Sequence, residues 1–333
     1  MVFIKYYLCY YLVMFTKEQL EHFKTKQVFI HTHDFPDPDA FASAYGLSEL
    51  LKHYGIDSVI CYGGVIERAN LIQMLKVFNI KASPRTNYEN QFFNAINILV
   101  DSQLNNANVA LNCGDDVYCI DHHPVFNDAE YKWKDIRAVG ACASIIISYY
   151  VESKVTMSKD VASALCYGLK MDTNDFNRGC TRFDIQMFDA VFEYADYEQV
   201  TYINQNQLEL DDFKAFKAAI NNTVTRDEFG FAYIPFQCPS TLVAIISDFL
   251  LSTKEVKISV VYSRLDDVVK FSIRSEDNNV HAGNLIRLAL KDIGNGGGHP
   301  TMAGGIIYKK YLDKIDNLED TVADLFTEAY KNM

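Results

Sequence analysis

The sequence predicts an α/β protein in which a parallel-sheet domain is joined by a helical linker to a smaller α/β domain. Between residues 27 and 170, short apolar runs alternate with helix-like stretches, which is typical of parallel βαβ units. After about residue 195 a charged, helix-prone stretch leads into a new series of strand-like runs. The length of 333 residues also suggests two domains, at roughly 150 residues for each.

The first half of the chain supplies four strand candidates and four helix candidates. The strand candidates are the apolar runs at 28–30, 57–62, 96–100 and 117–120. The helix candidates cover 40–53, 65–78, 141–152 and 159–170. Because the two kinds of segment alternate, we expect a parallel sheet with both faces covered, and ligands at the carboxyl ends of its strands.

The second half has its own strand and helix candidates. Strand-like runs lie at 231–236, 257–264 and 268–275, and helical stretches at 241–251 and over the last 20 residues. We therefore predict a first domain over 16–195, a helical linker over 196–225 and a second, smaller α/β domain over 226–333.

Residues 1–15 stand apart from this pattern. The apolar run after Lys5 is about ten residues long, too short for a bilayer that needs roughly 20 helical residues. No small-residue cleavage site follows it. We interpret residues 1–15 as a translation artefact or a disordered extension, with Met14 as an alternative start. No other segment has the length and hydropathy of a membrane span, so we expect no membrane partner.

Net charge and cysteine spacing exclude some classes of protein. The chain has 31 Lys and Arg against 43 Asp and Glu, a formal net charge of −12, which argues against a duplex-DNA binder. A nucleic-acid ligand would be short or held through bound cations. None of the eight cysteines forms a C-x-x-C pair, and several lie in apolar runs. They are interpreted as reduced core residues of a cytoplasmic protein.

Acids and imidazoles follow the predicted strands at their carboxyl ends. The stretch from His31 to Asp39 follows the first run, Asp101 follows 96–100, and Asp121 to His123 follow 117–120. Asp172 ends the helix at 159–170 and adds a fourth carboxylate. A single Asp at a strand end is often only a helix N-cap, and a lone His is more often structural than a ligand. Parallel topology, however, brings all these ends to one edge of the sheet.

Such a cluster points to metal ions. Neighbouring carboxylates repel each other unless cations neutralise them. Oxygen-rich sites with few imidazoles suit Mn²⁺ or Mg²⁺ before Zn²⁺. Two His and four Asp exceed the needs of one ion that must also bind substrate. They suit two ions about 3.5–4 Å apart, which together generate a nucleophile at neutral pH and clamp a phosphoryl group.

The motifs resemble those of the DHH phosphoesterase superfamily. The four motifs are His33-x-x-Pro36-Asp37-x-Asp39-x-x-x-Ser43, Asp101, Asp121-His122-His123 and Asp172-Thr173. Further along, residues 296–305 are similar to the GGGH signature of the DHHA1 domain, and residues 272–275 to its substrate-binding strand. The first domain would then be the DHH metal-binding catalytic domain, and the second the DHHA1 substrate-binding domain. Two departures from the family are Pro38, where relatives often have Gly, and Met302, where a small residue is common.

This resemblance implies a role for each site residue. The ligands of two divalent ions, most simply Mn²⁺, would be His33, Asp37, Asp39, Asp101, His122 and Asp172. Asp101 would bridge the ions, with Asp172 as a second candidate bridge, His123 would face the scissile phosphate, and Asp121 would orient the imidazoles. The substrate-binding residues would be Arg274, Ser275, Gly297, Gly298 and His299. Independently, a glycine run lets backbone N–H groups approach an anion, although a flexible turn is an equal alternative.

The function implied is a two-metal phosphoesterase. Its substrate would be a short oligonucleotide, or a small nucleotide such as phosphoadenosine phosphate. A cyclic or linear dinucleotide phosphodiesterase is an alternative, and a non-catalytic nucleotide-binding regulator is an alternative of another class. No expected ligand is missing, which argues against the regulator. Relatives are often dimers, so a homodimer stays open.

Overall fold

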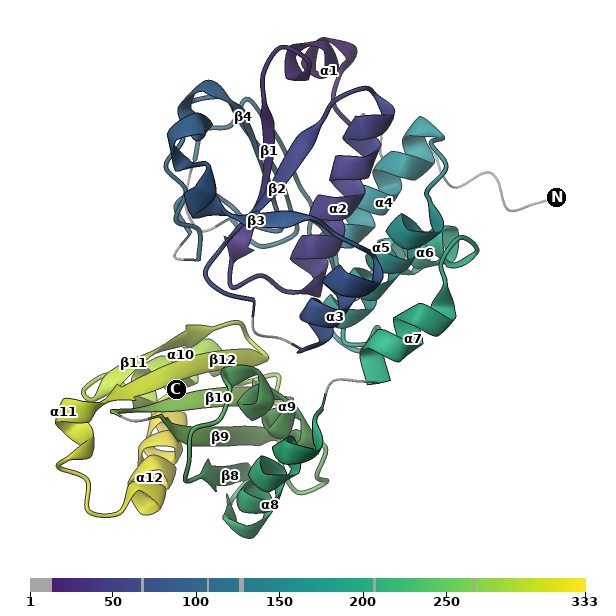
Figure 1. Cartoon of the computed structure of the whole chain (residues 1–333). Helices are drawn as coiled ribbons and strands as arrows, with labels where there is room; N and C mark the ends of the chain where they lie inside the picture. The colour runs from purple at the N-terminus through teal and green to yellow at the C-terminus, as the bar shows by residue number, and fades with distance from the viewer. Residues whose placement is uncertain (1–13, 67–68, 107, 126–128, 206–207, 266) are drawn as a thin grey trace. The chain divides into compact units, whose positions relative to one another are not determined.

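The computed structural model describes residues 14–66, 69–106, 108–125, 129–205, 208–265 and 267–333 (Figure 1). The chain forms two compact units that divide after residue 207. Each unit has its own six-stranded sheet and its own apolar core. The first sheet is entirely parallel and the second is mixed, which confirms the predicted fold class.

The sheet of the first unit has the strand order β3-β2-β1-β4-β5-β6. Its strands are β1 (Val28–Asp34), β2 (Ser58–Gly63), β3 (Ala82–Pro84), β4 (Ile96–Val100), β5 (Val117–Asp121) and β6 (Trp133–Ile136). The short edge strands β3 and β6 are not evident from the sequence because neither has a run of apolar residues. The order reverses between β1 and β4, and such a switch point is where open α/β sheets bind ligands.

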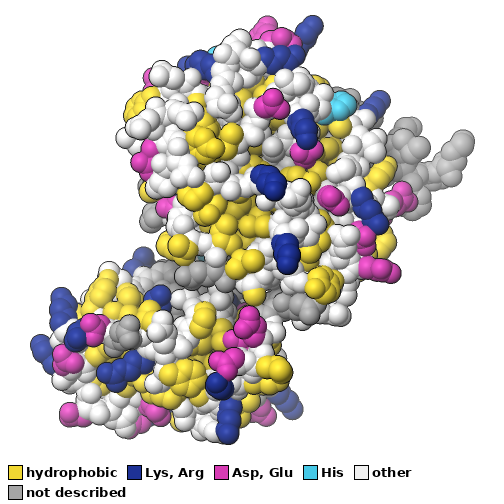
Figure 2. All heavy atoms as spheres, viewed as in Figure 1, with side chains coloured by type: hydrophobic (Ala, Val, Ile, Leu, Met, Phe, Trp, Pro, Cys, Tyr) yellow, Lys and Arg dark blue, Asp and Glu magenta, His cyan; other side chains and the backbone are white. Residues whose placement is uncertain are grey.

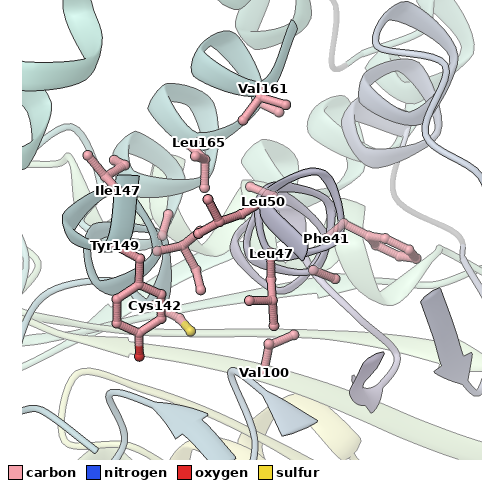
Figure 3. Packing of buried hydrophobic residues seen from close by; sticks show 14 of the residues in the cluster. Phe41, Leu47, Leu50, Val100, Cys142, Ile147, Tyr149, Val161 and Leu165 are labelled. Atoms are coloured by element: carbon pink, nitrogen blue, oxygen red, sulfur yellow. The ribbon is translucent and has the colours of Figure 1, made fainter. Parts of the chain in front are cut away.

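Helices cover one face of this sheet. They are α1 (Lys17–Phe23), α2 (Pro38–His53), α3 (Ala69–Val77), α4 (Cys142–Ser153), α5 (Lys159–Asp172), α6 (Arg182–Phe192) and α7 (Tyr197–Gln205). Figure 3 shows Leu47 of α2 beside Val100 of β4, and Cys142 of α4 and Leu165 of α5 belong to the same apolar cluster. All four are fully buried, so the helices that carry several of the predicted ligands are held by a dense core.

Irregular chain, rather than α-helix, covers the opposite face. Two 3₁₀ helices, η1 (Arg85–Asn87) and η2 (Glu89–Asn94), precede β4, and a long loop joins β4 to β5. Phe92 of η2 packs on Phe29 and Cys61, and Val109 of the loop packs near Leu99. Both faces are therefore covered, as expected.

The two predicted boundary segments differ in part from the expectation. Residues 1–13 of the expected extension lie outside the described residues. Met14 and Phe15 are buried, and the ring of Phe15 packs on Phe23, so the interpretation as a disordered extension does not hold for these two. The predicted linker over 196–225 is divided: α7 packs into the first core, and α8 (Phe213–Asn221) belongs to the second unit.

The second unit is a sheet with helices on both faces. Its strand order is β11-β12-β10-β9-β8-β7, antiparallel except for the parallel pair β8 and β9. The strands are β7 (Thr223–Arg226), β8 (Phe229–Ile234), β9 (Ile258–Leu265), β10 (Val268–Ser275), β11 (Gly294–Gly298) and β12 (Met302–Tyr308). The helical segments are η3 (Leu210–Asp212), α8, α9 (Ser240–Leu251), α10 (Ala282–Ala289), α11 (Lys309–Leu312) and α12 (Leu318–Lys331).

The glycine run is part of a strand and not a flexible turn. It forms β11, which pairs antiparallel with β12. The glycines allow α10 to approach the sheet closely: a Cβ on Gly283 would lie 2.3 Å from the carbonyl oxygen of Gly298. A Cβ on Gly305 would lie 2.4 Å from the side chain of Ile286. Close helix–strand packing, rather than turn geometry, therefore requires glycine at Gly283 and Gly305.

None of the helices in the described part of the chain combines the length and hydropathy needed to cross a bilayer. The seven cysteines within the described residues are all free. On the face that Figure 2 shows, Lys and Arg are scattered among Asp and Glu, with no continuous basic stripe over the described residues.

Candidate metal centre

Three predicted ligands come from the end of β1 and the start of α2. His33 lies on β1, and Asp37 is the N-cap of α2. Oδ1 of Asp37 accepts hydrogen bonds from the backbone N–H groups of Asp39 (3.0 Å) and Ala40 (3.1 Å). Pro38 occupies the first helical position, where its fixed φ suits a helix and its missing N–H leaves no bond unmade. This departure from the family pattern is thus compatible with the helix start.

Asp39 connects the first turn of α2 to the beginning of α4. Its two carboxylate oxygens accept hydrogen bonds from the backbone N–H groups of Cys142 (2.7 Å) and Ala143 (2.9 Å). The N-cap residue of α4 is Ala141, which has no side chain able to cap the helix. A buried carboxylate from another helix therefore replaces the missing cap.

Asp101 is the central residue of the cluster. It follows β4 directly, is buried, and has a φ of 56°, a left-handed conformation that Asp tolerates better than most side chains. Its Oδ1 lies 3.2 Å from Nε2 of His122 and 3.6 Å from Nδ1 of His123. Its Oδ2 lies 3.7 Å from Nε2 of His33. Asp101 thus faces imidazoles from two different strands.

Backbone carbonyls orient two of the imidazoles. Nδ1 of His33 donates to the carbonyl of Asp34 (2.9 Å), and Nδ1 of His122 donates to the carbonyl of Val139 (3.0 Å). Since a carbonyl can only accept, the proton lies on Nδ1 and Nε2 is directed to the cluster. This arrangement is usual for metal-binding histidines.

His123 is oriented differently, by Asp121. Nδ1 of His123 donates to Oδ1 of Asp121 (2.9 Å), and Oδ2 of Asp121 accepts from Nε2 of Gln103 (2.6 Å). The backbone N–H of His122 also donates to Oδ1 (2.8 Å). Hydrogen bonds thus engage both oxygens of Asp121, which supports the orienting role expected for it.

Asp172 completes the cluster from the C-terminal end of α5. Its Oδ2 lies 3.1 Å from Nε2 of His122. The NH2 group of Arg178 donates to the carbonyl of Asp172 (2.6 Å). Phe176 packs edge-on against Phe188, with 4.9 Å between ring centroids, and lies against the first core. Phe176 is therefore part of the packing around the core of the first unit.

The six predicted ligands fall into overlapping groups whose ligand atoms lie within 4.8 Å of one another. One group is His33, Asp37 and Asp101; a second is Asp39, His122 and Asp172; a third is Asp101, Asp121, His122 and His123. Asp101 and His122 each occur in two groups. The structure thus brings together residues that are up to 139 positions apart in the chain.

The electrostatics of the cluster are those of a site that needs positive charge. Burial and the nearby carboxylates of Asp101 and Asp172 raise the pKa of Asp39 well above its usual range. Burial also raises the pKa of Asp101. Burial disfavours protonation of His122, but its contacts with Asp101 and Asp172 outweigh this and raise its pKa well above the usual value. A bound cation would relieve these unfavourable charges.

Two buried atoms give a direct test of whether a metal fits. Oδ1 of Asp101 and Nε2 of His122 lie 3.2 Å apart, yet neither has a hydrogen-bond partner of acceptable geometry among the described residues. In the neutral imidazole, whose single proton lies on Nδ1, both atoms are lone-pair donors directed at each other. Such a pair requires a proton or a metal ion between them, so the residues fit a divalent cation.

The predicted substrate residues lie together within the second unit. Arg274 pairs with Met302 across β10 and β12, and Gly298 pairs with Ala303 across β11 and β12. The backbone N–H of His299 donates to the carbonyl of Met302 (2.7 Å). Two further backbone positions complete the set, Ser275 at the end of β10 and Gly297 on β11.

The side chain of Arg274 is bound to a residue that the sequence did not indicate. Its Nε donates to Oδ1 of Asp248 on α9 (2.6 Å), and its NH1 group donates to Ser272 (3.0 Å). Gln103 and Asp248 are thus two polar partners that sequence reasoning missed. Gln103 follows Asp101 by two residues and was detectable as a polar residue after a strand end, whereas nothing in the sequence pointed to Asp248.

Comparison with known proteins assigns both units. Residues 27–169 match the family described as "DHH family, N-terminal domain", and residues 227–328 match the DHHA1 domain. The chain belongs to the DHH family. Its two units are thus a DHH domain followed by a DHHA1 domain, as the two motif sets indicated.

Curated relatives of this DHH protein are longer than the matched region. An uncharacterized protein of Methanocaldococcus jannaschii is 29% identical over 308 residues, covering 89% of this chain and 62% of that protein. A probable manganese-dependent inorganic pyrophosphatase of Streptococcus thermophilus is 29% identical over 153 residues, covering 44% of this chain and 48% of that protein. The chain therefore spans between about half and two thirds of these relatives.

Solved structures share the fold. An exopolyphosphatase-related protein from Bacteroides fragilis has a TM-score of 0.74 at 15% identity, covering 97% of this chain and 98% of that chain. A manganese-bound RecJ exonuclease has a TM-score of 0.53 at 11% identity, covering 94% and 93%.

Proposed function

We propose that this DHH-family protein is a Mn²⁺-dependent phosphoesterase that hydrolyses short oligonucleotides or removes phosphate from small nucleotides such as phosphoadenosine phosphate. The observation that carries the proposal is the buried pair of Asp101 Oδ1 and His122 Nε2, which face each other without a hydrogen bond inside a cluster of acids. The similarity to a probable manganese-dependent inorganic pyrophosphatase supports both the metal and hydrolytic phosphoryl transfer.

The cluster has enough ligands for two ions. One ion would be held by His33, Asp37 and Asp101, and the second by Asp39, Asp101, His122 and Asp172, with Asp101 shared. When bound, such ions act as Lewis acids that neutralise phosphoryl oxygens and make water nucleophilic at neutral pH. Predominantly carboxylate ligands with two imidazoles suit Mn²⁺.

His123 is suited to contact the phosphate itself. Its side chain is 32% exposed, whereas His122 is nearly buried. Burial disfavours its protonation, but the hydrogen bond to Asp121 and the charge of Asp101 raise its pKa above the usual value. A protonated His123 can donate a hydrogen bond to a phosphate oxygen as negative charge develops there. Asp121, fixed in turn by Gln103, sets the direction of the ring.

The DHHA1 domain would supply substrate contacts. Arg274, Ser275, Gly297, Gly298 and His299 are proposed to bind the phosphate or base end of the substrate. A guanidinium and backbone N–H groups suit an anionic ligand. The acidic composition, with a net charge of −12, favours a short substrate over a long strand. The free cysteines support a cytoplasmic location.

A panel of substrates tests the proposal. The full chain with Mn²⁺ is assayed on a dinucleotide, a pentanucleotide, phosphoadenosine phosphate, a cyclic dinucleotide and pyrophosphate. We expect fastest turnover of the dinucleotide or phosphoadenosine phosphate. Preference for the cyclic dinucleotide would favour the alternative phosphodiesterase. Binding of nucleotides without turnover of any substrate would favour a non-catalytic regulator.

The matched variants are Asp101→Asn and Asp116→Asn. Each removes one carboxylate, but Asp116 lies at the start of β5, hydrogen-bonded to His22 (2.8 Å) and Lys26 (2.8 Å). We expect Asp101→Asn to abolish turnover and bind fewer Mn²⁺ ions, with an unchanged circular dichroism spectrum. Asp116→Asn should keep wild-type turnover. Wild-type turnover by Asp101→Asn would reject the metal account.

A further inference from the structure

Strand β1 has a β-bulge directly at a predicted metal ligand. Along the pair β1–β2, His31 is opposite Cys61, but the next paired residue, Asp34, is opposite Gly63. Three steps on β1 thus match two steps on β2, which places the bulge at Thr32 and His33. Pairing with β4 ends at His31 as well. A bulge re-aims a side chain, but it leaves backbone groups without a ladder partner.

The guanidinium of Arg85 binds the carbonyl that this bulge releases. Arg85 begins η1, after β3, and is only 5% exposed. Its NH2 group donates to the carbonyl of Thr32 (2.7 Å). Its NH1 group donates to Oδ1 of Asp34 (2.7 Å) and to the carbonyl of Ala110 (3.0 Å). One side chain therefore holds the residues on both sides of His33.

Asp34 connects Arg85 to the imidazole of His33. The carbonyl of Asp34 accepts the hydrogen bond from Nδ1 of His33 (2.9 Å). Oδ2 of Asp34 accepts from the backbone N–H of Ala110 (3.2 Å), and the backbone N–H of Asp34 donates to the carbonyl of Asn108 (2.7 Å). The position of Asp34, and with it the direction of Nε2 of His33, thus depends on Arg85 and on the β4–β5 loop.

We propose that Arg85 is a positioning residue for the metal centre, which fixes the bulge of β1 so that Nε2 of His33 faces Asp101. The inference rests on the proposed two-ion site. Arginine is required because two nitrogens of its planar guanidinium donate to three acceptors, on Thr32, Asp34 and Ala110. The ammonium of a lysine, on its flexible stem, does not reproduce this geometry. The hydrogen bonds of Arg85 go to Thr32, Asp34 and Ala110, none of which is a predicted metal ligand, so its effect should be confined to the ion that His33 would bind.

Mn²⁺ binding to the full chain tests the proposal without any substrate. Calorimetric titration of the wild type should resolve two ions. Arg85→Met should weaken one ion at least tenfold and leave the other within twofold. His33→Ala should weaken the same ion, and the double variant Arg85→Met/His33→Ala should bind no worse than His33→Ala alone. Such non-additivity is expected only if Arg85 acts through His33.

Two further variants separate positioning from general loss of stability. Val28→Ala removes buried side-chain atoms at the far end of the same strand, so it should lower stability but keep both affinities. Gly63→Ala disturbs the contact between Arg85 and Asp34 without replacing either residue, since a Cβ there would lie 1.9 Å from Oδ1 of Asp34. It should weaken the same ion as Arg85→Met, which also covers the case in which Arg85→Met fails to fold.

Three results would overturn the role of Arg85. They are wild-type binding of both ions by Arg85→Met or by a folded Gly63→Ala, equal weakening of both ions, and additive losses in the double variant. A wild-type chain that binds no Mn²⁺ would instead reject the two-ion site, and the role of Arg85 with it.

Discussion

The carboxylate of Asp39 accepts a hydrogen bond from the backbone N–H of Cys142 at 2.7 Å, although 103 positions separate the two residues in the chain. A predicted metal ligand therefore also serves as the N-terminal cap of α4. The other ligands have no such role for α4, so loss of Asp39 should affect the fold as well as the ion.

Asp39→Ala should destabilise the metal-free protein by about 2 kcal/mol, because it leaves the buried N–H groups of Cys142 and Ala143 without partners. Asp172→Ala is the matched control. Asp172→Ala relieves the same repulsion between the carboxylates of Asp39 and Asp172. Because Asp172 caps no helix, we expect its free energy of unfolding to change by no more than about 0.5 kcal/mol. Urea unfolding in the presence of a chelator measures both. Equal losses would contradict the capping role.

Asp121→Asn should lower kcat by roughly 100-fold while the number of bound Mn²⁺ ions stays the same. One carboxylate oxygen accepts a hydrogen bond from Gln103 and the other accepts one from His123. The amide of Asn has only one oxygen, so it cannot keep both bonds. His123 would then lose the bond that raises its pKa. Steady-state kinetics and metal analysis test this together, with His123→Ala as reference. Loss of an ion from Asp121→Asn would show that Asp121 is a ligand.

Asp248→Asn should lower the KM for a phosphate-bearing substrate by roughly two- to fivefold, the range expected for breaking an exposed ion pair. Asp248 neutralises Arg274 at 2.6 Å and would compete with a substrate phosphate for the guanidinium. The control is Asp324→Asn, which removes one of the two exposed carboxylates paired with Arg226 in the same domain. Michaelis–Menten kinetics at low salt measure the effect. An unchanged KM would remove Arg274 from the substrate site.

His31 should make the protein sensitive to mild acid. Burial lowers its pKa to about 3, from an ordinary value of 6.5, so the folded state resists protonation that the unfolded chain accepts. The stabilising contribution is complete above pH 6.5 and is lost as the pH falls towards 3. Between pH 7 and 5 this amounts to about 2 kcal/mol. Unfolding free energies of the wild type should fall by that much more than those of His31→Leu. Parallel pH profiles would contradict the prediction.

Much of the site could be predicted because parallel strands end at one edge. The apolar runs located β1, β4 and β5, and the polar residues that follow each run lie together. The edge strands β3 and β6 have no such runs, since packing on a neighbouring strand, and not their own hydropathy, makes them strands. The strand β11 is a run of glycines, which intrinsic propensity disfavours. Within it, a Cβ on Gly296 would lie 2.8 Å from the side chain of Ile286 on α10, whereas a Cβ on Gly294 or Gly298 would meet the backbone of β12.

The supporting residues could not be predicted for a related reason. Arg85, Gln103 and Asp248 act through hydrogen bonds to groups distant in sequence, and each such contact depends on register and on the bulge of β1. A one-residue shift in pairing would separate Arg85 from Thr32. Sequence periodicity identifies which face a residue occupies, whereas these contacts depend on distances of a fraction of an ångström.

The left-handed backbone of Asp101 has a consequence for how this protein could change over time. Glycine adopts a φ of 56° without strain, so Asp101→Gly would relieve both the backbone and the crowding of buried acids. We expect such a chain to fold more stably than its parent while losing its ion-binding residue. A single nucleotide change, from an aspartate to a glycine codon, would therefore exchange the proposed hydrolytic activity for greater stability, so Asp at this position would have to be maintained by selection for that activity.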